Sequence, residues 1–281
     1  MKLATIRMHD GSTRAVRVEG ERCVELGAKD LGELLAARDW HHSAEASAGE
    51  ERALSDFELA PVVPKPSKVI CVGLNYRTHI LEMGRELPEY PTLFAKFADT
   101  LIGATDDILK PVETDQFDWE CELAVVMGAK VRRVRGEQAE AAIAGFSVLN
   151  DITCRDWQYR TVEWLQGKNW QSTTPVGPYL VTPDELAGGV RPSLAISTVV
   201  DGETMQQDNT ADLLFDPVVL VEYVSTMVTL RPGDIIATGT PGGVGHAQQP
   251  ARYLQPGERV VTEIDGLGRL DNLVVADGAP T

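Results

Sequence analysis

Residues 118–128 read DWECELAVVMG and combine a strand pattern with a pair of acids. Polar and apolar residues alternate at first and then give way to an apolar run, as in a strand that enters a core. Side chains two apart on a strand point to the same face, so Glu120 and Glu122 can converge on one point while Cys121 faces the other way. Two carboxylates that converge in a partly buried place repel each other, and a hard divalent cation resolves this conflict.

A third acid lies farther along the chain, where the apolar strand FSVLND (residues 146–151) ends at Asp151. Together with Glu120 and Glu122 it offers oxygen ligands only, which select Mg²⁺, Mn²⁺ or Ca²⁺ over zinc. Each piece is ambiguous alone, because an E-x-E on a strand is usually a solvated polar face and a lone aspartate usually belongs to a turn or a helix cap. The metal hypothesis therefore depends on the neighbouring motifs.

A candidate base follows the predicted strand VICVGL (residues 69–74) directly, in the segment NYRTHILE (75–82). His79 and Glu82 are three residues apart and share a face if a helical turn starts here. A carboxylate bonded to one ring nitrogen orients an imidazole and makes the other nitrogen more basic, which suits the pair to deprotonate water. The alternative is an exposed helix pair of little energetic weight. The next stretch, MGRELPEYP (83–91), is either a lid that orders over ligand or a plain surface loop.

Two lysines and a glycine-rich turn are further candidates for anion binding. Lys96 lies in the apolar segment TLFAKF, where its ammonium either reaches solvent or meets a bound carboxylate. Lys168 lies in the polar segment QGKNWQ, where solvated and functional roles are equally open. An electrostatic role ranks above a Schiff base for either lysine, because the carboxylate cluster already suggests a metal as the electron sink. The turn TGTPGGVG (238–245) offers backbone N–H groups and the Thr240 hydroxyl, or is simply a tight turn, and it matches neither common nucleotide-binding motif.

The first 63 residues are predicted to form a small α+β domain. A hairpin is expected around Asp10-Gly11, and a short helix is expected after the capping residue Asp30. Three closely spaced prolines follow, and such a group cannot lie inside a helix or a central strand. The sequence therefore predicts two domains, at residues 1–63 and 64–281.

The second part of the chain is predicted to be mainly β, so the fold class is α+β, mainly β. Strand patterns recur between Pro-Gly turns, and Asp201-Gly202 predicts a hairpin. Helices are expected over residues 136–146 and 216–230. No internal repeat and no low-complexity tract occurs in the sequence.

Composition narrows the class of partner. The chain has 281 residues and a formal net charge of −16, which argues against nucleic acid and anionic membrane surfaces. A small anionic substrate remains compatible if its site carries local positive charge. No apolar stretch is long enough for a membrane helix, and the N-terminus turns polar too early for a signal peptide, so we expect a cytoplasmic protein. The four cysteines form no CxxC pair and are expected to be reduced and mostly buried.

Taken in order, these motifs resemble the fumarylacetoacetate hydrolase (FAH) family. The resemblance covers about residues 64 to 277, and the first 60 residues look like the variable N-terminal domain of many bacterial members. It implies an FAH-type mixed β-roll catalytic domain, usually in a homodimer. The matching blocks are VICVGLNYRTH, PTLFAKF, DWECELAVVMG, GFSVLNDITCRDWQ, GKNW, TPVGPYLVTPDE, LRPGDIIATGTPGGVG and LQPGERVVTEIDGLGRLDN.

The resemblance also implies a metal site. Glu120, Glu122 and Asp151 would bind one Mg²⁺ or Mn²⁺ per subunit. Cys121 is a mild departure from the glycine or aliphatic residue that the family often has between the glutamates, and we expect it to face away from the metal.

For the rest of the pocket, the resemblance implies a base and several substrate contacts. His79 with Glu82 would activate water, as in the compact acylpyruvase-like and fumarylpyruvate hydrolase-like bacterial members. Lys168 would bind the substrate or stabilise an enolate. Three further positions match residues that line the pocket of the family, namely Lys96, Gln158 and Thr240.

The function implied is that of a metal-dependent hydrolase that cleaves the C–C bond of an acylpyruvate, such as fumarylpyruvate, to pyruvate and a carboxylic acid. Water activated by His79 would attack the distal carbonyl, and the metal with Lys168 would stabilise the pyruvate enolate. Three arginines, Arg77, Arg85 and Arg155, either bind a distal carboxylate or are surface charge.

Two other functions stay open. One is a decarboxylase of oxaloacetate or a related 2-oxo diacid, or an isomerase or dehydratase of 2-oxo acids, acting through the same metal-bound enolate without an attacking water. The other is a non-catalytic metal-binding protein, which would lack the adjacent base and the pocket cations that this sequence carries.

Overall fold

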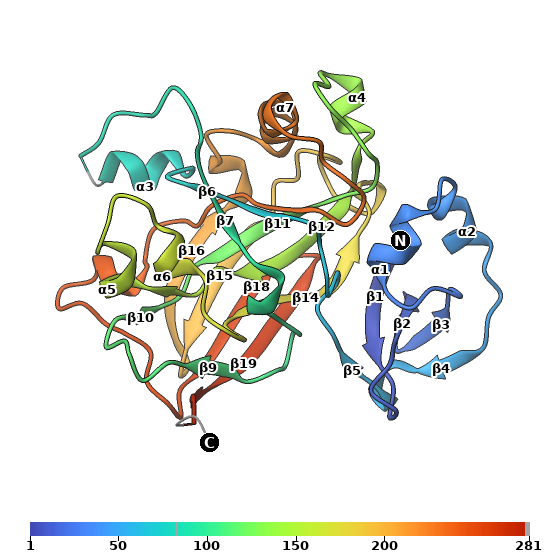
Figure 1. The fold of residues 1–281 in the computed structure, drawn as a ribbon, viewed down its shortest axis with the longest axis horizontal. Helices are drawn as coiled ribbons and strands as arrows, with labels where there is room; N and C mark the ends of the chain where they lie inside the picture. Colours follow the sequence, from blue (N-terminus) through green and yellow to red (C-terminus); the bar gives the residue numbers. More distant parts are fainter. Residues whose placement is uncertain (83, 279–281) are drawn as a thin grey trace.

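Two β-sheets form the frame of the protein (Figure 1). The computed structural model describes residues 1–82 and 84–278, and at Glu82 the backbone alone. In this part of the chain the larger sheet has twelve strands and the smaller main sheet has five, while the helices are short. The predicted α+β, mainly β class is confirmed.

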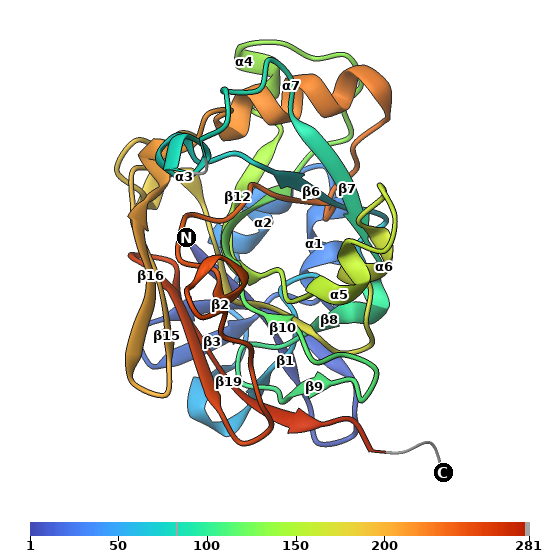
Figure 2. The ribbon, with the colours of Figure 1, turned by 90° about the vertical axis from the view of Figure 1, so that its left-hand side faces the viewer.

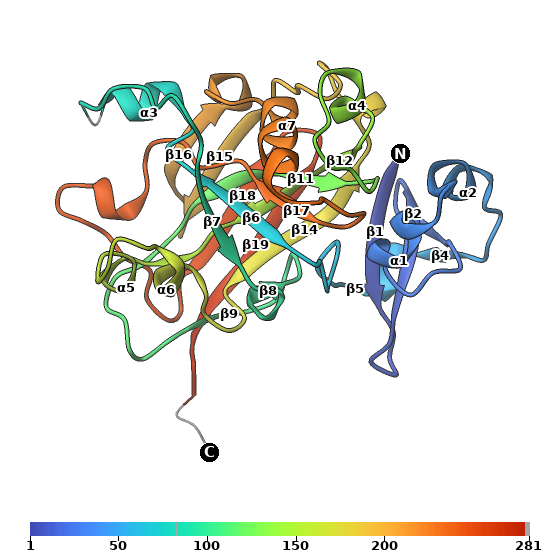
Figure 3. The same cartoon turned by 45° about the horizontal axis from the view of Figure 1, so that its top comes forward.

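The N-terminal unit lies beside the larger body of the molecule (Figures 1 and 3). Its elements are β1 Lys2–Arg7, β2 Thr13–Glu19, β3 Arg22–Glu25, α1 Leu31–Ala36, α2 Trp40–Ala46, β4 Glu51–Ala53 and β5 Glu58–Leu59. The predicted hairpin is present as the antiparallel pair β1–β2. Asp30 caps α1, because its carboxylate accepts a hydrogen bond from the N–H of Glu33 at 2.8 Å.

The larger sheet continues from this unit into the rest of the chain. Its further strands are β6 Val69–Gly73, β7 Thr92–Lys96, β8 Leu101–Ile102, β11 Cys121–Met127, β12 Ile143–Asn150, β14 Thr174–Val181 and β17 Ile235–Ala237. The strand order is β4-β3-β2-β1-β14-β12-β11-β17-β6-β7, so that β1 and β14 join the two parts. Strands from both sides of the predicted boundary at residue 63 thus belong to one continuous sheet, and the division into two domains stays a prediction.

The central strands β11 and β12 place the acids. All residues of both strands are buried, which explains the apolar runs in their sequences. β11 pairs antiparallel with β12 in a register that sets Cys121 opposite Asn150. This register brings the start of β11, with Glu120 and Glu122, next to the end of β12, where Asp151 follows.

The helix predicted over residues 136–146 is wrong in its second half. α4 covers only Glu137–Glu140, and β12 already begins at Ile143. The apolar residues that suggested a helix face are instead buried between β11 and β14. A Cβ at Gly145 would lie 2.2 Å from the carbonyl oxygen of Val181, so this close approach of two strands requires glycine.

The smaller main sheet carries the second predicted hairpin. Its strands are β9 Ile108–Lys110, β15 Ala195–Val200, β16 Glu203–Asn209, β18 Arg259–Ile264 and β19 Gly268–Ala276. β15 and β16 turn at Asp201 and Gly202, which have φ values of 48° and 83°. Positive φ at both positions is typical of the type I′ turn that Asp-Gly favours.

The helix predicted over residues 216–230 is present as α7, Pro217–Met227, which runs along the top of the molecule in Figure 2. The carboxylate of Asp216 accepts hydrogen bonds from the N–H groups of Val218 and Val219 at 2.8 and 3.0 Å. Pro217 occupies the first helical position, where a missing N–H does no harm.

Three short helices lie on the side of the body away from the N-terminal unit (Figures 1 and 3). They are α3 Arg77–Glu82, α5 Arg155–Gln158 and α6 Leu165–Lys168, and near α5 the strands β10 Phe117–Asp118 and β13 Thr153–Cys154 form a small pair. These segments carry most of the remaining candidate site residues.

The cysteines behave as their spacing predicts. All four are free and buried, and burial raises the pKa of the Cys154 thiol to about 12. Cys121 belongs to an apolar core cluster, and its sulfur meets Thr198 and Thr262 of the smaller sheet. Among the described residues, no helix has the length and apolar character needed to cross a bilayer.

Candidate active site

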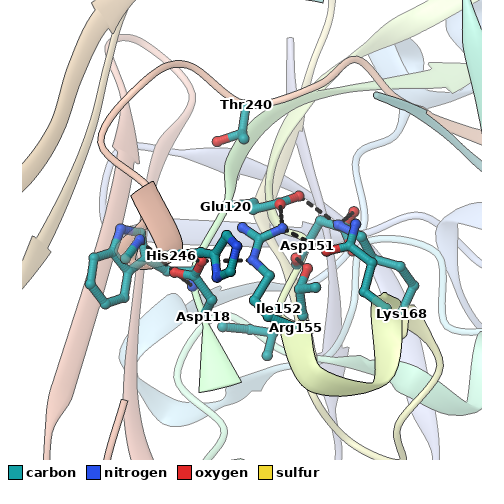
Figure 4. Close-up of polar contacts among 12 residues, drawn as sticks. Asp118, Glu120, Asp151, Ile152, Arg155, Lys168, Thr240 and His246 are labelled. Atoms are coloured by element: carbon teal, nitrogen blue, oxygen red, sulfur yellow. Dashed lines mark hydrogen bonds and ion pairs between the residues drawn. The ribbon is translucent and has the colours of Figure 1, made fainter. Parts of the chain in front are cut away.

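Three buried acids gather at the ends of β11 and β12, and Figure 4 labels two of them, Glu120 and Asp151. Glu120, Glu122 and Asp151 each offer a carboxylate oxygen, and these oxygens all lie within 4.8 Å of one another. Asp151 is fully buried, and Glu122 and Glu120 are 1% and 7% exposed. The convergence predicted from the strand pattern is therefore present, with the third acid brought in by strand pairing.

Two buried lysines neutralise part of this charge. Nζ of Lys168 lies 2.6 Å from Glu120 Oε2 and 2.8 Å from Asp151 Oδ2. Nζ of Lys96 lies 2.6 Å from Asp151 Oδ1 and donates to the carbonyl oxygen of Ile152 at 3.0 Å. Lys96 thus neither reaches solvent nor lines the pocket described below. Its carboxylate partner belongs to the protein.

The acids differ in how well their charges are compensated. Burial and repulsion by Asp151 and Glu120 raise the pKa of Glu122, whose Oε2 accepts one hydrogen bond from the N–H of Gly239 at 2.8 Å. Burial also disfavours the charged form of Asp151, but Lys168 and Lys96 outweigh it and lower the pKa of this acid. Glu122 is therefore the acid that most lacks a cation.

Lys168 is held as an ammonium ion. Burial alone would lower its pKa, but the carboxylates of Asp151 and Glu120 raise it above the ordinary value. A protonated amine cannot act as a Schiff-base nucleophile, so the environment supports an electrostatic role. Close contact of α6 with α5 sets its place, since a Cβ at Gly167 would lie 2.5 Å from Gln158.

Arg155 forms ion pairs with Asp118 and Glu120 that the sequence pattern did not predict. Nε of Arg155 lies 2.7 Å from Asp118 Oδ2, and Nη1 lies 2.7 Å from Glu120 Oε1 and 3.0 Å from Gln158 Oε1. Asp118 also accepts hydrogen bonds from the N–H groups of Gly245 and His246. The only signal in the sequence was an acid two residues before Glu120 and an arginine four residues after Asp151.

The residues present fit a hard divalent cation. The four acids of the cluster, counting Asp118, face three cations, so the buried acids outnumber their partner cations by one. Each carboxylate retains lone pairs beyond its present hydrogen bonds, and all donors are oxygens, as Mg²⁺ and Mn²⁺ prefer. Glu120, Glu122 and Asp151 are the residues that would hold the ion.

A pocket opens onto this cluster and brings most of the predicted residues together. It is lined by Glu120, Glu122, Lys168, Gln158, Thr240, His79 and Arg85, with Arg155, Tyr159, Trp164, Phe94 and His246 among its other walls. Two predicted site residues, Lys96 and Asp151, are buried and do not line the pocket. His246 was missed, because no local pattern marks a lone histidine in a glycine-rich segment.

The predicted base pair is only partly described. His79 lies on α3, is half-buried and lines the pocket. The side chain of Glu82 lies outside the described residues, so its pairing with His79 stays a prediction. In the segment that follows, the described residues 84–90 are mostly exposed, and the lid hypothesis stays a prediction as well.

The three arginines that were considered as partners of a distal carboxylate have different environments. Arg155 is buried and already paired with Asp118 and Glu120. Arg77 is exposed, donates to the carbonyl oxygen of Leu214 and does not line the pocket. Arg85 lines the pocket mouth and is exposed, which leaves its guanidinium accessible to an anion.

Comparison with known proteins identifies the family. Residues 68–275 match the family described as fumarylacetoacetate (FAA) hydrolase C-terminal. The chain is 44% identical over 218 residues to the mitochondrial oxaloacetate tautomerase Fahd2a of Rattus norvegicus, covering 77% of this chain and 69% of that protein. It is 38% identical over 257 residues to the oxaloacetate tautomerase YisK of Bacillus subtilis (strain 168), covering 90% and 85%. A solved structure of fumarylacetoacetate hydrolase from psychrophilic Exiguobacterium antarcticum is 33% identical, with a TM-score of 0.87 over 99% of this chain and all of that one. The chain therefore belongs to the fumarylacetoacetate hydrolase family, as its motifs predicted.

Proposed function

We propose that this enzyme interconverts the keto and enol forms of a short 2-oxo diacid such as oxaloacetate. The observation that carries the proposal is the buried cluster of Glu120, Glu122 and Asp151 with the Lys168 ammonium beside it, at the base of a pocket that also holds His79. The relatives from Rattus norvegicus and Bacillus subtilis are named oxaloacetate tautomerases, and these two support the 2-oxo diacid alternative over acylpyruvate hydrolysis.

The size of the pocket agrees with a short substrate. It encloses about 160 Å³, less than the roughly 300–1,000 Å³ of sites that take drug-sized ligands. A four-carbon diacid suits such a volume. Its two charges also suit a pocket that is lined by two cations, the buried Lys168 and the exposed Arg85.

The chemistry follows from what each group supplies. Glu120, Glu122 and Asp151 would hold a divalent cation, which when bound would supply positive charge for an anionic 2-oxo acid. The Lys168 ammonium donates to the 2-oxo oxygen, where negative charge grows as the enol forms. His79 removes a proton from C3 and gives it back, directly or through a water molecule, to the 2-oxo oxygen, so that the substrate keeps its protons and His79 ends as it began.

A substrate panel tests the proposal. Oxaloacetate is offered with Mg²⁺, with Mn²⁺ and with EDTA. Enol–keto exchange is followed by ultraviolet absorbance, and pyruvate release is followed in a coupled assay. Acetylpyruvate and fumarylpyruvate are offered in parallel. We expect metal-dependent exchange that exceeds both pyruvate release and acylpyruvate cleavage. Faster cleavage of an acylpyruvate would restore the hydrolase hypothesis, and pyruvate release as fast as exchange would make the enzyme a decarboxylase.

His79→Ala is expected to lower kcat/KM for tautomerisation by about 10²–10⁴, because general-base catalysis contributes that much. Glu82→Gln is expected to act in the same direction if Glu82 orients the imidazole. Binding of oxalate, an anion with no proton to lose from carbon, serves as the control and should be unchanged in both variants. An unchanged rate in His79→Ala would remove this residue from the mechanism.

Arg85→Ala is expected to raise KM for oxaloacetate by about tenfold, because one accessible charge at the pocket mouth is lost. KM for a monocarboxylate such as 2-oxobutanoate should change little, since that substrate has no distal carboxylate. Arg77→Ala is the matched control, as Arg77 is exposed on the neighbouring helix but does not line the pocket. Equal effects of Arg85→Ala on both substrates would rule out a distal-carboxylate contact.

Three further statements stay predictions. They are the homodimer, the cytoplasmic location and the choice between Mg²⁺ and Mn²⁺ as the single ion of each subunit. The binding hypotheses for Gln158, Thr240 and Lys96 likewise await variants, and for Lys96 the contact with Asp151 supports an indirect role.

A further inference from the structure

Gln206, on β16 of the smaller sheet, is a buried side chain that contacts the pocket turn. It is 1% exposed. Its Nε2 donates to Thr240 Oγ1 at 2.8 Å and to the carbonyl oxygen of Pro241 at 2.9 Å. Its Oε1 accepts from the N–H of Cys121 at 3.1 Å and from Thr198 Oγ1 at 2.7 Å. All four polar positions of the amide are therefore used.

These partners determine which way the amide points. The N–H of Cys121 can only donate, and the carbonyl of Pro241 can only accept. If the amide were turned over, its NH₂ group would face the N–H of Cys121 and its oxygen would face the oxygen of Pro241. Neither contact is a hydrogen bond, so the NH₂ group must face Thr240.

This orientation dictates what the Thr240 hydroxyl can do. A hydroxyl has one hydrogen and can accept as well as donate. Because Oγ1 accepts from Gln206, its hydrogen is not used in that bond and can be donated to another partner. Thr240 is half-buried, lines the pocket and stands across from Glu120 in Figure 4. Accepting one bond also polarises a hydroxyl as a donor for the next.

We propose that Gln206 is a positioning residue that directs the Thr240 hydroxyl into the pocket as a hydrogen-bond donor to an anionic oxygen of the substrate. The inference rests on the proposed function, since that function places a dianion in this pocket. Gln206 also holds the backbone of Cys121, which lies between two of the acids.

A double-mutant cycle tests the inference. Gln206→Met keeps the length of the side chain and removes the amide, and Thr240→Val keeps the shape and removes the hydroxyl. Each single variant is expected to weaken oxalate binding, measured by calorimetry with Mn²⁺ present, by about 10–100-fold, the value of one hydrogen bond to a charged group. KM for oxaloacetate should rise in parallel. In the Thr240→Val background, Gln206→Met should cause no further loss.

Gln206→Glu covers the case in which Gln206→Met does not fold. It keeps the acceptors for Cys121 and Thr198 but places an acceptor against Thr240, so the hydroxyl turns toward it, and oxalate binding should weaken by the same 10–100-fold. Thr5→Val, which removes a buried hydroxyl bonded to Val62 and Leu31 in the N-terminal unit, controls for loss of stability alone and should bind oxalate normally.

Three results would overturn the inference. They are full oxalate affinity in Gln206→Glu, additive losses in the double variant, and full affinity in Thr240→Val. All three can be obtained without turnover. Failure of the inference therefore differs from failure of the proposed function, which would instead be seen as wild-type protein that binds oxalate but does not exchange oxaloacetate.

Discussion

Lys168→Met is expected to abolish turnover and to lower the free energy of unfolding of the metal-free protein by about 3–5 kcal/mol, the usual effect of removing one partner from a buried ion pair. Nζ of Lys168 lies between Glu120 and Asp151 at 2.6 and 2.8 Å and is 1% exposed. Without it, these carboxylates lose a shared cation, and the 2-oxo oxygen loses a donor. Denaturant unfolding in EDTA and the exchange assay measure the two effects.

Lys96→Met is the matched control for that variant. Lys96 is also buried and also pairs with Asp151, but it does not line the pocket. It should lose stability by a comparable amount and keep much more of its activity at temperatures where it is folded. If Lys168→Met kept turnover within tenfold of wild type, or if the two variants lost activity equally, a direct role of the Lys168 ammonium would be excluded.

Glu122→Gln is expected to have opposite effects on the metal-free and the metal-loaded protein. Burial and the repulsion by Asp151 and Glu120 raise the pKa of Glu122. At pH values above the pKa that this carboxyl has in the unfolded chain, folding must therefore either take up a proton at Glu122 or bury its unfavourable charge, and both lower the stability. Removing this charge should stabilise the metal-free protein by about 1–2 kcal/mol, or about 2–8 °C in Tm. Glutamine can still accept from the N–H of Gly239.

The same substitution should abolish the gain in Tm that Mg²⁺ or Mn²⁺ gives the wild type, and with it metal-dependent exchange, because a ligand oxygen with its charge is lost. Glu120→Gln is the informative comparison. Glu120 is paired with Lys168 and Arg155, so the metal-free variant should lose stability instead of gaining it. Thermal unfolding of the three proteins with EDTA and with Mn²⁺ decides the matter. A destabilised Glu122→Gln in EDTA would contradict the charge argument.

Local patterns account for much of the fold that the sequence predicted. Asp201 and Gly202 both have positive φ in their hairpin turn, whereas at Asp10-Gly11 only the glycine does. Asp30 and Asp216 cap helices with their own carboxylates. The failure at residues 136–146 has the opposite origin. Strand β12 is buried between two neighbours, and such burial overrides a helical period that local sequence suggests.

The candidate site divides in the same way. That Glu120 and Glu122 face one point follows from the two-residue period of a strand, and the motif order alone was enough to indicate the family. The partners of these acids could not be predicted from local sequence patterns, because each partner comes from a distant segment of the chain. The ion pairs of Lys96 and Lys168 with Asp151, and the ion pair of Arg155 with Glu120, depend on which strands become neighbours.

Geometry that depends on residues a few positions apart could be predicted from the sequence, as the turns, the helix caps, the buried strands and the E-x-E pair were. The register between strands that are far apart in the chain could not be predicted in this way. Cys121 pairs with Asn150, and Gln206 reaches Cys121 and Thr240 from another sheet. A shift of one residue in such a pairing would turn every side chain to the opposite face. Only the packed molecule therefore decided that three acids, two lysines and an oriented hydroxyl meet in one place.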